Sequence, residues 1–493
     1  MTRWIAILAM VFGAGAADAS TSPETALADY VAKPDASYVW REHARYEVPG
    51  AEIIELRLHS QTWQNVLWKH QLVLVKPTGL SWSSDQASAR PHQGLLIIGG
   101  GRWRDGDDSR LLAELPKRSR IFVEMASRLD TVVAVLGQVP FQPMFGMTED
   151  ELIAYSFEQY LATGDTEWPL LLPMVKSVVR AMDATQAFTT EQWGMDIERF
   201  TVIGGSKRGW TTWLTGAVEP RAAALVPTVI DALNFEAHMP YQSTVWGAPS
   251  EKLDPYTKRN MVETLGSARG RDLRTIVDPY AYRDRFVQPK LIVVATNDEY
   301  FPLDSLNLYW DGLPEPKSVL YLPNDRHSIE DFGRLIPALN VIHRHSSEGA
   351  PMPDLEWEFV ERADSIRLCV RAAPQPVTVA VWSAASRDAG FRDARFVPQL
   401  IGIDDGVYVY DMRWPTSGFR AAFAEVFFRD GDRRYVLSTN LRIADTAGRA
   451  PSAATAIVGR PGVCPSDTST PAAAAALTPV STPASPRAAT NLR

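Results

Sequence analysis

A serine stands between a short apolar run and a helical segment in the stretch TVIGGSKRGWTTW, residues 201–213. The apolar run ends on two glycines, and Ser206 follows them directly. A strand, a tight glycine turn, a serine and a helix form a nucleophile elbow, which holds a hydroxyl on a strained turn above a sheet. The usual pattern has glycine two residues before and two after the serine. Here Gly204 fits, Arg208 takes the second place, and Gly209 comes one residue later.

An aspartate and a histidine follow later apolar runs in the order that this chemistry needs. A serine becomes a good nucleophile when a base takes its proton and a third group orients the base. In α/β-hydrolases the acid and then the histidine come after the serine, each beyond a later strand. Asp298 follows the run KLIVVATN, and His327 follows SVLYLPNDR. We therefore predict a catalytic triad of Ser206, Asp298 and His327.

Other residues remain open for the acid and the base. Asp304 and Asp325 are alternatives for the acid. Glu299 adjoins the predicted acid, but it would point the opposite way if the strand continued. His238 is the rival base. It comes before the acid in the chain, so we expect it to be a pocket or structural residue.

The oxyanion formed during attack needs preset backbone donors, and two loops are expected to supply them. One donor is the N–H group of Lys207, directly after the serine; the others are Gly100 and Gly101 in LLIIGGGRW, after an early strand. The adjacent cations Lys207 and Arg208 favour an anionic substrate, with solvated helix-start cations as the alternative. The residues expected to face the substrate are Arg102, Trp103, Arg208, His238 and Trp246.

The segments that must position these residues show two different patterns of secondary structure. Up to about residue 350, short β-rich runs such as GLLIIGGG, TVVAVLGQ and KLIVVATND alternate with helical stretches. Such runs are typical of buried parallel strands. We therefore predict an α/β-hydrolase domain with a doubly wound, mainly parallel sheet over 20–350, preceded by an antiparallel hairpin. The long insertion at about 234–288 is predicted to form a lid.

The C-terminal part lacks helical patterns. Residues 351–446 contain strand-like runs such as VTVAVWSA and RRYVLSTNLRI, which predict a smaller all-β sandwich of immunoglobulin or fibronectin type. Residues 447–493 are rich in Ala, Thr, Pro and Ser and are predicted to be a disordered tail. The sequence leaves open whether Cys369 and Cys464 pair.

The N-terminal residues 1–19 read as a secretory signal peptide. Arg3 precedes a short apolar run, and Ala17-Asp18-Ala19 is a cleavage site. The run is too short to span a bilayer, so we expect an exported protein, secreted or periplasmic, without stable membrane insertion.

The net charge of −8 does not indicate the positively charged surface that nucleic-acid-binding proteins use, so no nucleic-acid partner is expected. No metal-ligand or nucleotide-binding motif is present in the sequence, so no metal and no cofactor are expected.

Several motifs together resemble the PhoPQ-activated pathogenicity-related protein family. They are GGSKRGWTTWLT, VIDALN, ATNDEYFPLDS, PNDRHSI, TWQNVLWKHQLVLVKP and VVRAMDATQ, and the resemblance extends over Ala26–Ile443. It implies an α/β-hydrolase with a signal peptide and no settled substrate. The elbow is also similar to that of glucuronoyl esterases, which place glycine three residues after the serine.

These observations predict an exported serine hydrolase that cleaves an ester or peptide bond through an acyl-enzyme. Its substrate is expected to be a small molecule, a glycan or a peptide. The alternatives are a carbohydrate esterase and a secreted signalling or binding protein that keeps a hydrolase scaffold without physiological turnover. The sequence does not set the oligomeric state.

Overall fold

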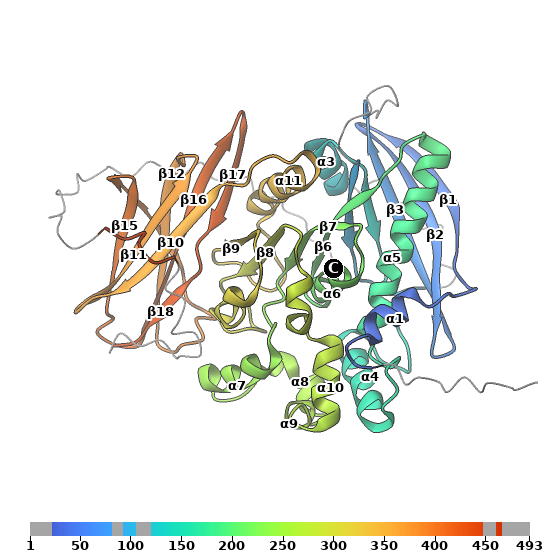
Figure 1. Ribbon diagram of the computed structural model, residues 1–493, viewed down its shortest axis with the longest axis horizontal. Coiled ribbons are helices and arrows are strands. Elements are labelled where there is room, and N and C mark those ends of the chain that lie inside the picture. Colours follow the sequence, from blue (N-terminus) through green and yellow to red (C-terminus); the bar gives the residue numbers. More distant parts are fainter. Residues whose placement is uncertain (1–21, 81–91, 105–119, 447–459, 466–493) are drawn as a thin grey trace, which may run out of the picture.

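The centre of the largest sheet is parallel, as the computed structural model in Figure 1 shows. The structure describes residues 22–80, 92–104, 120–446 and 460–465. The central strands are buried aliphatic runs, as expected of parallel strands covered on both faces. This confirms the predicted α/β-hydrolase fold. In spatial order the strands are β5 (Val133–Leu136), β4 (Gln93–Ile98), β6 (Arg199–Gly205), β7 (Ala222–Thr228), β8 (Lys290–Ala295) and β9 (Lys317–Leu322).

Antiparallel strands extend the sheet beyond β5. They are β3 (Val66–Pro77), β2 (Ala51–Trp63) and β1 (Val39–Val48). The hairpin of β2 and β3 is the antiparallel pair that the sequence predicts. Gln64 and Asn65 close it with φ of 47° and 62°, the left-handed pair that a tight hairpin turn needs. Strand β1 is not predicted from the sequence, because its residues form no apolar run. This agrees with the structure, in which none of its side chains is fully buried.

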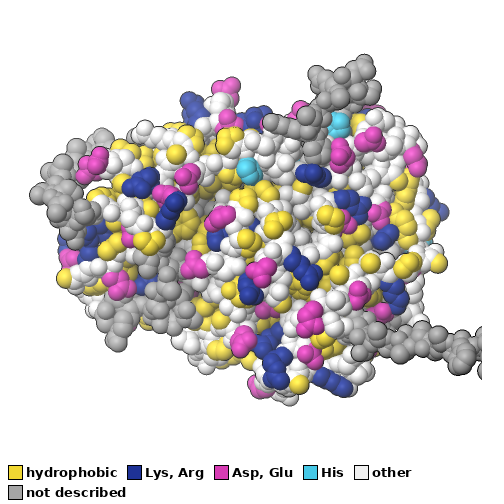
Figure 2. Space-filling view, viewed as in Figure 1, with side chains coloured by type: hydrophobic (Ala, Val, Ile, Leu, Met, Phe, Trp, Pro, Cys, Tyr) yellow, Lys and Arg dark blue, Asp and Glu magenta, His cyan; other side chains and the backbone are white. Residues whose placement is uncertain are grey.

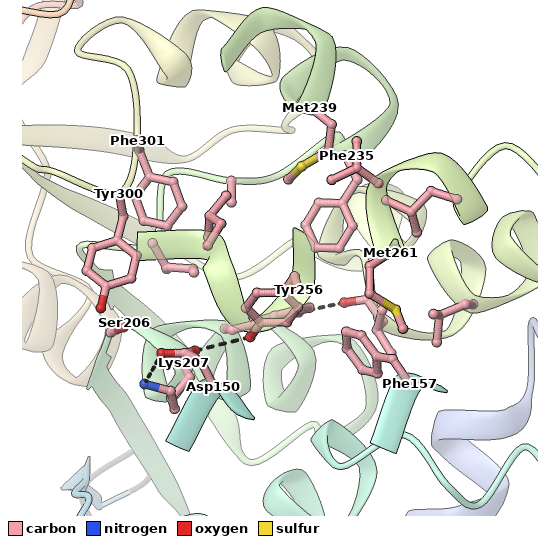
Figure 3. A pocket seen from close by; sticks show the side chains of 18 residues that line it. Asp150, Phe157, Ser206, Lys207, Phe235, Met239, Tyr256, Met261, Tyr300 and Phe301 are labelled. Atoms are coloured by element: carbon pink, nitrogen blue, oxygen red, sulfur yellow. Dashed lines mark hydrogen bonds and ion pairs between the residues drawn. The ribbon is translucent and has the colours of Figure 1, made fainter. Parts of the chain in front are cut away.

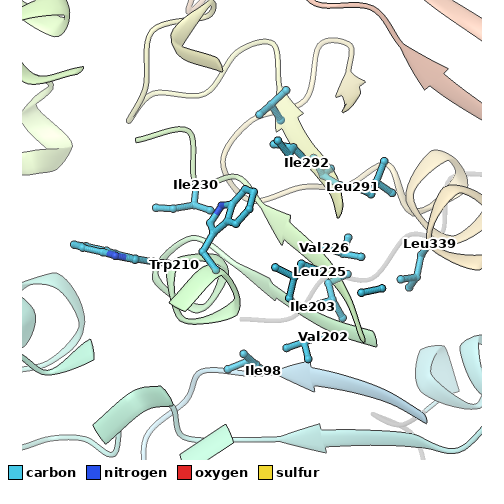
Figure 4. Packing of buried hydrophobic residues seen from close by; sticks show 14 of the residues in the cluster. Ile98, Val202, Ile203, Trp210, Leu225, Val226, Ile230, Leu291, Ile292 and Leu339 are labelled. Carbon is cyan, nitrogen blue, oxygen red and sulfur yellow. The ribbon is translucent and has the colours of Figure 1, made fainter. Parts of the chain in front are cut away.

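Helices cover both faces of the sheet. Trp210 of α6 packs on one face beside Ile230, while Leu339 of α11 packs on the other (Figure 4). The segment between β7 and β8, predicted as a lid, folds into α7 to α10. The helices are α1 (Ala26–Ala32), α3 (Arg120–Leu129), α4 (Glu149–Thr163), α5 (Leu171–Phe188), α6 (Lys207–Val218), α7 (Phe235–Trp246), α8 (Asp254–Thr257), α9 (Met261–Thr264), α10 (Ala268–Val277) and α11 (Phe332–Glu348).

The C-terminal strands form the predicted all-β sandwich. One of its sheets contains β17 (Arg433–Ser438), β16 (Phe419–Asp430), β12 (Thr378–Ser386) and β13 (Val397–Ile401), with β18 (Arg442–Ala444) beside β16. The facing sheet contains β10 (Asp354–Glu361), β11 (Ser365–Ala373), β15 (Val407–Arg413) and β14 (Ile403–Asp404).

The sandwich is continuous with the α/β part. Ser438 of β17 pairs with Val319 of β9, so one sandwich sheet extends the central sheet. Without β17, strand β9 would present an unpaired edge. Buried side chains from both parts also belong to one contiguous hydrophobic core. The predicted α/β part and the predicted all-β part therefore share one sheet and one hydrophobic core.

A disulfide bond joins Cys369 of β11 to Cys464, with 5.2 Å between their Cα atoms. Residues 460–465 lie along β10, where the Arg460 N–H donates to the Trp357 carbonyl. The Cys464 N–H donates to Glu358 at 2.8 Å. This piece of the predicted tail is therefore attached to the sandwich. The predicted signal peptide and the rest of the tail lie outside the described residues.

Charged side chains of both signs are interspersed over the visible face in Figure 2.

None of the described helices is long and apolar enough to cross a membrane.

We expect Cys464→Ser to lower the free energy of unfolding of the sandwich by about 2–4 kcal/mol, since the bond closes a long loop in the unfolded chain. Urea denaturation followed by fluorescence measures the change. Cys369→Ser and the double variant should lose the same amount, because each removes the same bond. A double variant as stable as the wild type would contradict this expectation.

Candidate active site

Ser206 occupies a strained turn between β6 and α6. Its φ of 58° and ψ of −129° lie outside the regions that side-chain-bearing residues favour. The Ser206 N–H donates to the Thr228 carbonyl at 2.8 Å, and the Trp210 N–H donates to the Ser206 carbonyl at 3.0 Å. These bonds hold the turn and present the hydroxyl at the carboxyl edge of the sheet, as an elbow requires.

The two glycines of the elbow are needed for close packing. A Cβ atom on Gly204 would lie 2.5 Å from the Arg208 carbonyl oxygen. A Cβ atom on Gly209 would lie 2.8 Å from a methyl carbon of Ile230 and 2.9 Å from the Gly204 carbonyl oxygen. Gly209 therefore permits the close approach of α6 to the sheet, and the second elbow glycine is shifted by one residue.

His327 and Asp298 are hydrogen-bonded in series with the serine. The His327 Nδ1 atom lies 2.9 and 3.1 Å from the two carboxylate oxygens of Asp298. A carboxylate only accepts, so the ring carries its proton on Nδ1 and leaves Nε2 as an acceptor. Nε2 lies 2.8 Å from the Ser206 hydroxyl oxygen. The structure thus brings the three predicted triad residues together.

The loop after β8 fixes the orientation of the histidine. The Tyr300 N–H donates to Asp298 at 2.8 Å, which holds the carboxylate. The Tyr300 ring stacks on the imidazole with 4.0 Å between ring centroids. Glu299, an open alternative for the acid, accepts a hydrogen bond from the His327 backbone N–H at 3.4 Å and does not contact the ring nitrogens.

The other alternative acids have different partners. Asp304 accepts the Tyr241 hydroxyl at 2.6 and 2.7 Å. Burial raises the pKa of Asp304 to about 6, although the Tyr241 hydrogen bond lowers it. Asp325 accepts the backbone N–H groups of Glu330 and Asp331, and so shapes the loop that carries the histidine.

A further aspartate was not predicted as part of this region. Asp231 follows β7, and its buried carboxyl accepts the Tyr309 hydroxyl at 2.8 Å and the Leu306 N–H at 3.1 Å. Burial raises the pKa of Asp231 to about 8. Its place shortly after the apolar strand β7 is the signal that marks it in the sequence.

The carbonyl groups of the glycine loop after β4 accept hydrogen bonds from the 138–142 segment. Those of Gly99 and Gly100 accept the N–H groups of Val139 and Gln138, and the Gly101 carbonyl accepts the Gln142 side chain. Strands β4 and β6 are parallel neighbours, so this loop and the Ser206 turn leave the same sheet edge together. Among the described residues, the N–H groups of Gly100 and Gly101 have no hydrogen-bond acceptor. Their role as oxyanion donors, together with that of the Lys207 N–H, stays a prediction.

Arg208 joins the glycine loop to α4. Its Nε donates to the Val139 carbonyl at 2.5 Å, and its guanidinium binds Glu149 at 2.9 Å. The guanidinium lies against Gly100, where an added Cβ atom would be 2.5 Å from it. The expectation that Arg208 binds substrate is therefore corrected: the side chain is occupied in holding the loop.

Lys207 is also paired. Its Nζ atom lies 3.1 Å from Glu149 and 3.2 Å from Asp150, and its side chain is only 8% exposed. Cations are unfavourable at a helix N-terminus, and these carboxylates at the start of α4 compensate for them. The cations are thus neither solvated nor free for an anionic substrate.

Glu149 is the centre of this cluster. Besides the two cations it accepts the Gln142 side chain at 2.5 Å, and its own N–H donates back to Gln142. Burial alone would raise the pKa of Glu149, but Arg208, Lys207 and Gln142 lower it to about 2. The depressed pKa means that the cluster stabilises the fold above about pH 4.5 and loses that contribution as pH falls toward 2.

The remaining predicted substrate residues lie away from the pocket beside Ser206. Arg102 contacts Thr148 at 3.4 Å, and Trp103 packs against the Arg57 guanidinium. His238 is fully buried, with Gln242 2.9 Å from its Nε2 atom. Trp246 stacks on Arg392 of the sandwich at 3.8 Å. Trp103, His238 and Trp246 thus pack inside the fold or between its parts, which corrects their assignment to substrate binding, whereas Arg102 is exposed and does not line this pocket.

The sandwich supports the loops that carry the acid and the histidine. Asn297 donates to backbone carbonyls in the loop between β12 and β13, at Phe391, Arg392 and Ala394. Asn324 exchanges two hydrogen bonds with the backbone of Phe396 in the same loop. Neither asparagine was predicted to have a role.

Comparison with known proteins bears out the resemblance. A family model described as PhoPQ-activated pathogenicity-related protein matches residues 27–395, which end before the expected Ile443. Autocrine proliferation repressor protein A of Dictyostelium discoideum is 30% identical over 440 residues, which cover 81% of this chain and 85% of that protein.

Solved structures similar to the chain include two esterases. An acetyl xylan esterase from Paenibacillus sp. R4 has a TM-score of 0.41 and 15% identity, with 65% of this chain and 92% of that chain covered. A glucuronoyl esterase from Solibacter usitatus has a TM-score of 0.37 and 13% identity, with 65% and 92% covered.

We expect Glu149→Gln to lower kcat for a p-nitrophenyl ester about tenfold or more, with KM little changed. The loss of charge loosens Arg208 and the glycine loop, and small misplacements of catalytic groups are costly in rate. Glu151→Gln is the matched control, since Glu151 lies on the same helix with an exposed side chain. Equal kcat values in the two variants would contradict this role of Glu149.

Proposed function

The chain belongs to the PhoPQ-activated pathogenicity-related protein family, and we propose that it is a serine hydrolase that cleaves an ester through an acyl-enzyme. The observation that supports the proposal most is the hydrogen-bonded series Ser206, His327 and Asp298, at 2.8 and 2.9 Å. A hydroxyl, an imidazole and a buried carboxylate in this order are the groups that activate a nucleophilic serine.

In the proposed first half-reaction, the Ser206 oxygen attacks the ester carbonyl carbon while His327 Nε2 takes the hydroxyl proton. The Asp298 carboxylate stabilises the imidazolium that forms. The carbon–oxygen bond to the alcohol then breaks, and the alcohol leaves with the proton from Nε2. In the second half-reaction, water gives its proton to the same nitrogen and attacks the acyl-enzyme, which releases a carboxylic acid and restores Ser206.

The negative charge on the former carbonyl oxygen needs donors that are already in place. We assign this role to the N–H groups of Lys207, Gly100 and Gly101. The carbonyls of the glycine loop are fixed by the 138–142 segment, so its N–H groups need not reorganise during the reaction. Such preset donors commonly contribute about 2.7–4 kcal/mol of transition-state stabilisation each.

We propose that the protein is exported and that residues 1–19 direct this. The disulfide between Cys369 and Cys464 supports the proposal, because such bonds persist mainly in oxidising compartments.

Signalling is a second candidate function. It is favoured by the 30% identity to a protein whose name describes it as an autocrine proliferation repressor. Such a role could use the enzyme activity or only the surface of the fold, and retention of a signalling response by Ser206→Ala would distinguish these.

A fluorophosphonate probe is expected to label Ser206, and Ser206→Ala should abolish labelling, because the probe requires an activated serine. Mass spectrometry of the tryptic peptides locates the adduct. Ser60→Ala is the matched control: Ser60 also contacts a histidine, His70, at 2.9 Å, but this pair is buried and His70 binds a backbone carbonyl rather than a carboxylate. An adduct on Ser60 or elsewhere would contradict the proposal.

Asp298→Asn is expected to lower kcat for a p-nitrophenyl ester by roughly 10⁴-fold, because an amide favours the wrong tautomer of His327. Asp304→Asn should leave the turnover of folded enzyme nearly unchanged, since Asp304 binds Tyr241. Steady-state kinetics on folded fractions of both variants makes the comparison. A larger loss in Asp304→Asn would mean that the acid is misassigned.

A further inference from the structure

A pocket that is partly open to solvent lies beside Ser206 (Figure 3). It is enclosed by α4, α6, the helices α7 to α10 and the loop after β8. Most of its lining consists of aliphatic and aromatic side chains, among them Phe157, Trp210, Phe235, Met239, Met261 and Leu273.

Most polar side chains of the lining are already paired. Lys207 lies 3.2 Å from Asp150, and the Tyr256 hydroxyl donates to the same carboxylate at 3.1 Å, as the dashed lines in Figure 3 show. The Trp210 indole N–H donates to the Val277 carbonyl at 2.6 Å. These groups satisfy one another or a backbone carbonyl, which leaves the Tyr300 hydroxyl as the one polar side-chain group of the described lining free to bind a hydroxyl group of a sugar.

The lining discriminates between ligand classes. A hydroxylated ring would give up hydrogen bonds to water and gain few in return, which opposes its entry. An alkyl chain loses no hydrogen bonds and gains with each methylene that leaves water. The pocket therefore favours an apolar chain.

The position of the histidine indicates which half of the ester enters. The alcohol takes its proton from Nε2 as it leaves, so it must lie beside His327. His327 does not line the pocket, whereas Ser206 and Lys207 do. The half of the substrate that stays bonded to Ser206 is thus the half with access to the apolar lining.

We propose that this pocket binds the acyl chain, and that the substrates are esters of apolar, unbranched carboxylic acids of medium length. This inference rests on the proposed function. The serine oxygen forms its bond to the acyl carbon, the bond to the alcohol oxygen breaks, and water then releases the free acid.

The test is kcat/KM for p-nitrophenyl acetate, butyrate, hexanoate and octanoate, which share one leaving group. We expect a rise of roughly fourfold per added methylene. A flat or falling series on an enzyme whose Ser206 takes the fluorophosphonate label overturns the acyl pocket and leaves the proposed function standing. Absence of both label and hydrolysis overturns the proposed function itself.

A second series tests which half of the ester is bound. Methyl, butyl and octyl esters of octanoic acid vary only the alcohol, and we expect kcat/KM to change little across them. A rise with alcohol length, together with a flat acyl series, would assign the pocket to the alcohol and overturn the proposal.

A single substitution tests whether the apolar lining of this pocket causes the preference for long acyl chains. Val262 is a half-buried lining residue of α9, so Val262→Gln places an amide in the pocket with little risk to the core. We expect the ratio of kcat/KM for octanoate over acetate to fall at least about tenfold, because the chain then meets an amide that it cannot hydrogen-bond. Val341→Gln, at a half-buried position of α11 outside the pocket, should keep the wild-type ratio. Equal ratios in the two variants would overturn the proposal.

Discussion

The close packing of α6 on the sheet at the Ser206 turn is the constraint on which the site depends. The turn holds Ser206 at positive φ, which costs on the order of 1–3 kcal/mol and persists only where the surroundings enforce it. They do so through the Thr228 hydrogen bond and through contacts too close to admit a side chain at Gly204 or Gly209. The hydroxyl position, the helix N-terminus and the position of the proposed oxyanion donor at Lys207 all follow from this one backbone geometry.

The turn also creates an electrostatic problem that the fold resolves with α4. Two cations follow the serine at a helix N-terminus, where positive charge is unfavourable. Glu149 and Asp150 neutralise them, and Arg208 then reaches the glycine loop without leaving a buried charge unpaired. An arginine where the common elbow has glycine thus links the Ser206 turn to the glycine loop that we propose to bind the oxyanion. The same pairing leaves the adjoining pocket nearly free of unsatisfied polar groups.

The sequence alone was sufficient to predict those parts of the site that local patterns encode. Ser206, Asp298 and His327 each follow an apolar strand, so their order and their common edge could be predicted. The role of Glu149 could not be predicted, because its two cationic partners, Lys207 and Arg208, lie far along the chain and meet it only through the spatial order of the strands. His238 and Trp246 were misassigned for a related reason: an aromatic side chain in an insertion can face a substrate or pack inside the fold, and composition does not separate the two.

The C-terminal sandwich is part of the machinery that positions the proposed triad. Its loop 391–396 binds Asn297, directly before Asp298, and also Asn324, close before His327. Arg392 in that loop donates to the Glu299 carbonyl at 3.1 Å. The family match reaches residue 395 and so includes most of this loop, although it omits most of the sandwich strands. A shared sheet, a shared core and these bonds make the acid and histidine loops mechanically dependent on the sandwich, which therefore acts as a support for the site as well as an attached domain.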